Sequence, residues 1–357
     1  MEKNNIKEDN KNKEFKNVML SSGDLLDENG ELIQAGFAYD LVRVYDRNKI
    51  KARKSRIKEW DYYYLGNERF GLALTIDDNS YMTMLSFTFL DFVNKKEITK
   101  SNIKLLTSKR VTFPSTSKIG DVHLKYNDNA YLTFSNDGVR RHLYGAFANF
   151  DGNKELMVDC YLEETIDGSM VIATPFEKSK HFYYNQKINC LKVSGGIFIG
   201  EDEYDFTDSY GVLDWGRGVW TYKNTWYWGS LSACVDGVTI GFNLGYGFGD
   251  TSKASENMLM FNGKCIKLDD CVFNIPKNEK GKDEFLKEWT ISSNSNRAVI
   301  DLKFKPILNR HAKTDILVIA SIQNQVFGVF DGEIRVEGTT YKISNLTGFC
   351  EKVFNKW

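Results

Sequence analysis

The sequence predicts an all-β protein, and three observations support this prediction. Aromatic residues make up 14% of the 357 residues and proline occurs only 4 times, a balance that favours strands. Asp-Gly and Asn-Gly pairs, which accept the positive φ of two-residue hairpin turns, recur along the chain. Between them apolar and polar side chains alternate and no long segment has helical periodicity, so an antiparallel sandwich or barrel is expected. The pairs are Asn29-Gly30, Asp137-Gly138, Asp151-Gly152, Asp167-Gly168, Asp236-Gly237, Asn262-Gly263 and Asp331-Gly332.

The chain begins with a polar segment. The letters "MEKNNIKEDNKNKEFKN" mix acidic residues with lysines and contain no apolar run. This composition predicts a disordered tail over residues 1–19 and fits neither a secretory signal nor a membrane anchor. Two successive series of strands are then expected, a first β-barrel lobe over residues 20–187 and a second over residues 188–357.

Individual strands are clearest in four places. Residues 81–92 and 315–322 are rich in aromatic and β-branched side chains, and residues 298–307 alternate apolar with polar ones. Within residues 325–343, two successive hairpin turns are predicted to join three short strands. A polar segment, residues 274–289, is expected to interrupt the second lobe as a loop or a short helix.

Charge and cysteine usage exclude several function classes. With 47 basic and 48 acidic residues the formal net charge is −1, so neither nucleic acid nor a membrane surface is expected as a partner. No run of ~18 apolar residues occurs, which predicts a soluble, cytoplasmic protein without a transmembrane segment. The six cysteines form no Cys-x-x-Cys pair, and the acidic run at residues 201–208 lacks the glycine of a calcium loop. No metal site is therefore expected.

A tryptophan-rich motif, "DWGRGVWTYKNTWYWGS", covers residues 214–230 and contains four of the seven tryptophans. Each indole offers a large apolar face and one N–H that needs a partner when buried. Several such rings around one cavity would make a slot for a flat or lipophilic molecule, and the alternative is a tryptophan-rich core. Trp220, Tyr222, Trp226 and Trp228 share one strand parity, whereas Trp215 and Arg217 share the other.

Two carboxylates near this motif are candidate proton donors. A buried Arg217 requires a counter-charge, either Asp214 or an acidic group of a ligand. Asp214 can act as an acid only if the arginine is engaged elsewhere, because pairing with a cation lowers the pKa of a carboxyl group. Glu256 is the other candidate proton donor, since an apolar pocket can keep a carboxyl group protonated. For both carboxylates, the alternative to a catalytic role is a structural hydrogen bond or ion pair.

A glycine-rich segment follows at residues 241–250, "GFNLGYGFGD". Its four glycines share one parity and alternate with apolar residues such as Tyr246, which indicates a strand with one bare face. A dinucleotide fingerprint would have to open a helix after a strand, so that interpretation is disfavoured. Glycine inside a strand lets a bulky neighbour approach closely, either an aromatic side chain or a ligand.

These motifs together resemble the DUF2804 family. The match lies in "LDWGRGVWTYKNTWYWGS", "GFNLGYGFGDTSKASENMLMFNGK", "QVFGVFDGEI" and the ending "GFCEKVFNKW". The resemblance implies a calycin-like architecture of two tandem lipocalin-type barrels, a grouping that includes carotenoid hydratases and tocopherol cyclases. Such proteins handle lipophilic substrates without a redox cofactor, so none is expected. The family's motif residues correspond here to Asp214, Trp215, Arg217, Trp220, Trp226, Glu256 and Asn257.

The sequence therefore predicts a barrel pocket for a lipophilic small molecule. Acid/base chemistry without a cofactor, such as hydration, isomerisation or cyclisation, would use Asp214 or Glu256 as the proton donor. The alternatives are a carrier or sensor that releases its ligand unchanged, and barrels packed solid around a structural core. The expected ligand-binding residues are Trp215, Arg217, Trp220, Tyr222, Trp226, Trp228, Tyr246 and Asn257.

Overall fold

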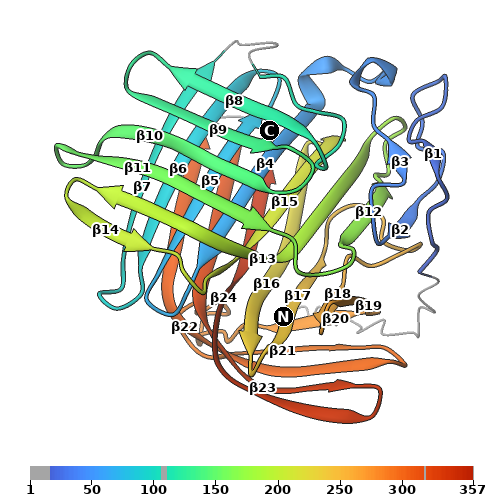
Figure 1. The fold of residues 1–357 in the computed structure, drawn as a ribbon. Helices are drawn as coiled ribbons and strands as arrows, with labels where there is room; N and C mark the ends of the chain where they lie inside the picture. Colours follow the sequence, from blue (N-terminus) through green and yellow to red (C-terminus); the bar gives the residue numbers. More distant parts are fainter. Residues whose placement is uncertain (1–16, 106–110, 317–318, 357) are drawn as a thin grey trace.

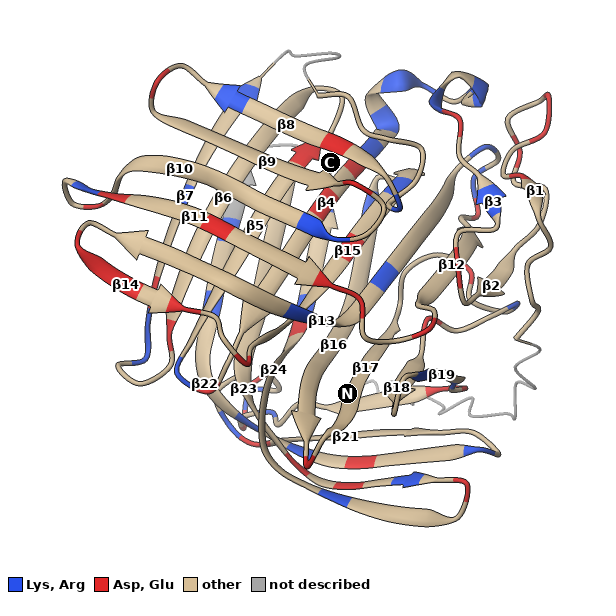
Figure 2. Ribbon diagram, in the orientation of Figure 1, with Lys and Arg blue, Asp and Glu red and all other residues tan. Residues whose placement is uncertain are grey.

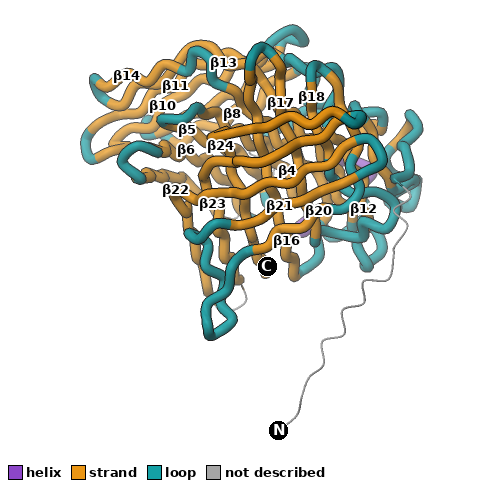
Figure 3. The backbone as a smooth tube through the Cα atoms, turned by 90° about the horizontal axis from the view of Figure 1, so that it is seen from below, coloured by secondary structure: helices purple, strands orange, loops and turns teal. Residues whose placement is uncertain are grey.

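A computed structural model of the chain describes residues 17–105, 111–316 and 319–356. In this part of the chain nearly all regular structure is strand, and the helical residues form two single turns, η1 (Arg47–Lys49) and η2 (Lys54–Arg56) (Figure 3). The all-β prediction is confirmed. Within the same ranges, no helix combines the length and the hydropathy needed to cross a bilayer.

Thirteen strands form the first sheet, whose pairs are all antiparallel (Figure 1). Its main path runs β7-β6-β5-β4-β15-β13-β11-β10-β9-β8. Off this path, β12 and β14 pair with β13, and β2 pairs with β12. The strands are β2 (Gly36–Ala38), β4 (Ile57–Gly66), β5 (Phe70–Asp78), β6 (Met82–Asp91), β7 (Lys96–Leu105), β8 (Gly120–Tyr126), β9 (Ala130–Asn136), β10 (Arg141–Asp151), β11 (Lys154–Glu163), β12 (Met170–Pro175), β13 (Phe182–Ile199), β14 (Asp202–Asp205) and β15 (Tyr210–Val219).

Nine strands form the second antiparallel sheet, in the order β19-β18-β17-β16-β24-β23-β22-β21-β20. Two short strands, β1 (Gly23–Asp24) and β3 (Arg43–Val44), pair separately in parallel. The strands of the second sheet are β16 (Lys223–Val235), β17 (Val238–Tyr246), β18 (Met258–Phe261), β19 (Lys264–Lys267), β20 (Cys271–Asn274), β21 (Trp289–Asn294), β22 (Ala298–Ile316), β23 (Ile319–Val336) and β24 (Thr339–Lys356).

Each sheet curls around a core of its own, as the lipocalin-like prediction requires (Figure 1). Inward-facing side chains of the first sheet include Leu213 and Trp215, and those of the second include Trp289 and Phe304. Two further buried clusters combine residues from both sheets and so fill the junction between them. Lysine, arginine and acidic residues are interspersed over both sheets (Figure 2).

The hydrogen-bonded sheets change between β15 and β16, at residues 220–222. The predicted lobe boundary, between residues 187 and 188, falls inside β13, whose partners all belong to the first sheet. The tryptophan-rich motif is thus divided between the sheets rather than confined to the second. As a division into separate domains, the boundary stays a prediction. Of the predicted tail, residues 1–16 lie outside the described residues, whereas Met19 forms a bridge with Phe37.

Local detail differs from the prediction in three places. Asp167-Gly168 lies in the loop between β11 and β12, which do not pair with each other, and Asp167 bridges to Lys264 instead. Residues 315–322, expected as one strand, are the end of β22 and the start of β23, and residues 317–318 lie outside the described residues.

Asp331-Gly332 is not a hairpin turn but a bulge within the continuous strand β23, where the register with β24 shifts between Phe330 and Gly332. Gly332 has φ +144°, and the Asp331 carboxylate accepts a hydrogen bond from the Asn345 amide at 2.9 Å. Residues 325–343 therefore form two strands instead of three. The polar segment that begins after β20 is a loop leading into β21.

Candidate functional site

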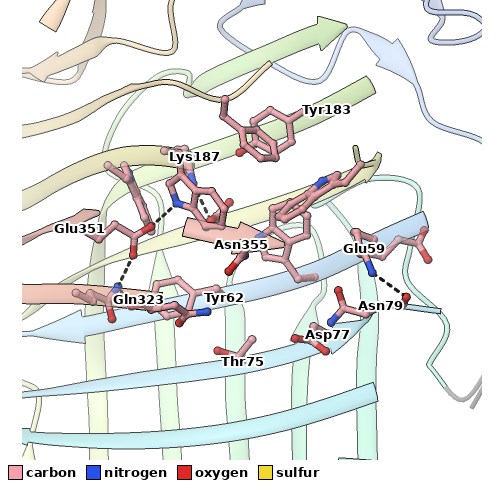
Figure 4. A pocket seen from close by; sticks show the side chains of 18 of the residues that line it. Glu59, Tyr62, Thr75, Asp77, Asn79, Tyr183, Lys187, Gln323, Glu351 and Asn355 are labelled. Carbon is pink, nitrogen blue, oxygen red and sulfur yellow. Dashed lines mark hydrogen bonds and ion pairs between the residues drawn. The ribbon is translucent and has the colours of Figure 1, made fainter. Parts of the chain in front are cut away.

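A cavity of ≈ 220 Å³ lies at the junction of the two sheets (Figure 4). The first sheet contributes side chains from β4, β5, β6, β13 and β15, and the second from β16, β22, β23 and β24. Most of the apolar wall is aromatic. Its aromatic members are Trp60, Tyr62, Tyr183, Trp220, Trp226, Trp228 and Phe248.

The aromatic rings of this wall contact one another at their edges and faces. Trp60 stacks on Tyr183 with centroids 6.0 Å apart, and its edge meets Trp220 at 5.3 Å. Trp220 in turn lies 5.8 Å from Trp226. The Trp226 indole donates to Glu351 Oε1 at 2.7 Å, so the polar edge of that ring is held by the protein. The apolar faces remain available to the cavity, a common property of small-molecule sites.

Gly216 explains how Trp60 reaches its position. The two residues are directly opposite each other on β15 and β4. A Cβ atom at Gly216 would overlap the indole ring of Trp60, whose nearest atoms would be Cζ2, Cε2 and Cη2. The absence of a side chain at residue 216 therefore lets the indole lie flat across β15 and form one wall of the cavity.

Replacing Gly216 with alanine is expected to lower the free energy of unfolding by about 1–3 kcal/mol, because the rigid Trp60 ring must leave its place between Tyr183 and Trp220. Urea denaturation and the near-ultraviolet circular dichroism of the tryptophans measure the effect. In a Gly216→Ala, Trp60→Phe double variant the smaller ring should remove part of the loss caused by alanine. An unchanged unfolding midpoint and spectrum for Gly216→Ala would contradict the claim that the Trp60 indole needs a glycine at residue 216.

A buried ion pair faces the cavity. Lys187 on β13 and Asp214 on β15 are register partners, and Lys187 Nζ lies 2.7 Å from Asp214 Oδ2. The other carboxylate oxygen of Asp214 accepts a hydrogen bond from Asn185 Nδ2 at 2.6 Å. Lys187 Nζ also lies 3.7 Å from the ring centroid of Trp228, within the range of a cation–π contact. Asp214 is thus engaged on both oxygens by the protein.

Glu256 occupies a different environment. It lies in the segment between β17 and β18, with its carboxyl group over Gly245, where a Cβ atom would come within 2.6 Å of Oε1. No hydrogen bond or ion pair from the described residues reaches this carboxyl group. Burial raises the pKa of Glu256 to about 7, and the neighbouring charge of Lys187 only partly offsets this effect. A proton can therefore be held and released here near neutral pH.

Glu351 on β24 is a second carboxyl group in the cavity. Besides Trp226, it accepts a hydrogen bond from Gln325 Nε2 at 3.4 Å, and the same amide donates to the Tyr62 hydroxyl at 3.1 Å. Burial raises the pKa of Glu351 to about 7. The sequence motifs did not indicate this residue, and its only local signal is a single acidic side chain among the aromatic residues and lysines that end the chain.

The structure brings together five of the residues selected from sequence and leaves five elsewhere. Tyr222 is 41% exposed, Tyr246 stacks on Tyr227 at 4.5 Å beside the second core, and Trp215 is buried in the first core. Asn257 holds its own segment, since its side chain accepts from the Gly245 amide and donates to the Asp269 carbonyl, both at 2.7 Å. The predicted residues that line the cavity are Asp214, Trp220, Trp226, Trp228 and Glu256.

Arg217 does not meet Asp214 and is not among the residues that line the cavity. Its guanidinium group is fully buried and pairs with Asp61 on β4 at 2.9 Å, while also donating to the carbonyl oxygens of Trp60 and Gly216. The reason is strand parity, because Arg217 is three residues from Asp214 and faces the opposite side of β15. The role of anchoring an acidic ligand group is therefore not supported for Arg217, and the cation beside Asp214 is Lys187.

A family model described as "Domain of unknown function (DUF2804)" matches residues 16–357. No curated protein sequence matches. Three solved structures among those that resemble the fold share little sequence with this chain. They are kievitone hydratase from Nectria haematococca (11% identity, 88% of this chain and 96% of that chain, TM-score 0.46), a putative AttH from Nitrosomonas europaea (11%, 87% and 96%, 0.47) and CghA with Sch210972 (7%, 84% and 88%, 0.44).

Proposed function

The chain belongs to the DUF2804 family, and from that premise and the geometry of the cavity we propose that it binds a small, largely apolar molecule at the junction of its sheets and transfers a proton to it. One observation carries the proposal. The Glu256 carboxyl group is buried in an aromatic cavity, no described protein group holds it, and burial raises its pKa to about 7. A group that only stabilised the fold would gain more from a hydrogen-bond partner.

Glu256 is the proton donor in this proposal. Its hydroxyl proton would pass to a carbon–carbon double bond or an enol of the ligand, leaving a carboxylate on Glu256 and a cation on the ligand. The faces of Trp220 and Trp226 would stabilise that cation by about 1–2 kcal/mol in a desolvated site. The carboxylate would then recover a proton from a water that adds to the cation, or from a neighbouring carbon, which gives hydration or isomerisation. This chemistry requires no redox cofactor.

Asp214 is the less suitable donor, because Lys187 and Asn185 already engage both of its oxygens. Its part in the proposal is to hold the ammonium group of Lys187 beside the wall of the cavity. The size of the cavity also restricts the ligand. A volume of ≈ 220 Å³ is below the roughly 300–1,000 Å³ of sites for drug-sized ligands, which favours a compact molecule with one or two rings.

The test is extraction of the purified protein with organic solvent, identification of the bound compound by mass spectrometry, and incubation of that compound with fresh protein. Conversion by the wild type should fall about 100-fold or more in Glu256→Gln, because general acid catalysis contributes at least that factor. Glu279→Gln, at an exposed loop residue, is the matched control and should convert normally. Recovery of the compound unchanged from wild-type protein would indicate a carrier and reject the catalytic proposal.

A further inference from the structure

The cavity has a second polar end, away from Lys187 and Glu351. Figure 4 shows Asp77 and Asn79 grouped at one side of the cavity, with Lys187 and Glu351 at the other and Asn355 between them. Aromatic rings form most of the wall that joins the two ends. A ligand that fills the cavity therefore meets polar side chains at both of its ends.

Lys58 and Asp77 are two charged residues at this second end. Lys58 Nζ donates to the Asn79 carbonyl oxygen at 3.1 Å and lies 4.2 Å from the ring centroid of Tyr81, with the whole residue only 1% exposed. Burial lowers the pKa of Lys58 to about 7. These two contacts fix the ammonium group at the cavity wall, on β4, beside the end of β5.

Asp77 lines the same end of the cavity from β5. Burial raises the pKa of its carboxyl group to about 7, and the charge of Lys58 opposes this effect. Its Oδ1 atom is buried and has no hydrogen-bond partner among the described residues. Buried polar atoms in folded proteins are nearly always paired, so the protein alone leaves this carboxyl group incompletely satisfied.

We infer that the ligand carries a hydroxyl group at each end of an apolar body, one facing Lys187 and Asp214 and the other facing Lys58 and Asp77. The second hydroxyl group would donate to the Asp77 carboxylate, which supplies the hydrogen bond that its Oδ1 atom lacks, and would accept from the nearby Lys58 ammonium group. A lipid with one polar head would leave the Asp77 Oδ1 atom without a hydrogen bond, so the recognised class is a compact diol or bisphenol. The inference rests on the proposed function, because it requires that the cavity holds a ligand.

Two probes that differ by one hydroxyl group, 4-hydroxybiphenyl and 4,4′-dihydroxybiphenyl, test the inference by isothermal titration calorimetry of the full chain. Wild-type protein should bind the dihydroxy probe about tenfold or more tightly than the monohydroxy probe, the contribution expected of a hydrogen bond to a charged group. A Lys58→Met, Asp77→Leu double variant should bind both probes with similar affinity. Removing both partners together leaves no uncompensated buried charge, which favours a folded variant.

Glu279→Gln is the control, because residue 279 is exposed and is not among the residues that line the cavity. The control should keep the wild-type preference for the dihydroxy probe. Equal affinities of wild-type protein for the two probes would overturn the inference that the second polar end binds a hydroxyl group. The proposed function would remain standing. Failure of both probes to bind would count against the cavity as a ligand site and so against both conclusions.

Discussion

Replacing Asp61 with leucine should lower the free energy of unfolding by about 3–5 kcal/mol, the cost of leaving a buried charge without its partner. Arg217 is fully buried, and Asp61 is its only ion-pair partner among the described residues. The guanidinium group also lies 4.1 Å from the ring centroid of Trp215, which belongs to the first core. Urea denaturation followed by tryptophan emission measures the loss.

Two further variants test whether the loss in Asp61→Leu comes from the unpaired charge of Arg217. In an Asp61→Leu, Arg217→Met double variant both charges are gone, so we expect it to be more stable than Asp61→Leu alone. Asp24→Leu breaks the exposed pair with Lys49 and should change the free energy of unfolding by less than about 1 kcal/mol. A loss of under about 1 kcal/mol for Asp61→Leu would show that the Arg217 charge is compensated by something other than Asp61.

Replacing Glu256 with glutamine should stabilise the protein at alkaline pH. The pKa of Glu256 is raised from 4.5 to about 7 by folding, so the folded state binds more protons than the unfolded state between these values. The contribution of this group to stability is therefore fully present below about pH 4.5 and is lost as the pH rises through about 7. Above pH 8 the wild type should carry a penalty of about 3 kcal/mol, obtained from 1.36 kcal/mol per pKa unit, that the glutamine variant lacks.

Denaturation curves of wild type and Glu256→Gln from pH 4.5 to 8.5 measure this difference directly. The two proteins should be similar in stability at the acidic end and diverge as the pH rises. Glu279→Gln serves as the control, because residue 279 is exposed, and its difference from wild type should stay constant. A constant difference for Glu256→Gln would mean that the carboxyl group is ionised throughout, and it would remove the basis for a proton donor.

The strands could be predicted from sequence because the signals for them are local. Alternation of apolar and polar residues and the Asp-Gly and Asn-Gly pairs both act over a few residues. The exception at Asp331-Gly332 shows the limit of such signals, since a glycine with positive φ suits a bulge as well as a hairpin turn. Only the partner strand, β24, distinguishes the two, and its register is set by contacts far away in sequence.

The candidate site could be predicted only in part, for the same reason. Asp214, Trp220 and Trp228 lie in one motif and reach the cavity together, and strand parity alone separates Arg217 from them. Lys58 and Glu351 come from strands whose neighbours are fixed by the pairing of whole sheets. Nothing in their local sequence indicates that they meet at one cavity, because register over long separations is set by global packing.

Because the cavity walls belong to both sheets, neither sheet encloses the site alone. Side chains from residue 58 to residue 355 must all be in place before the cavity has its shape. A compound bound there would contact both sheets. By mass action it would favour the form in which the two sheets are packed together over forms in which they are partly separated. If the proposed ligand binds there, occupancy and resistance to proteolysis are linked, so removal of the compound should make the protein more sensitive to protease.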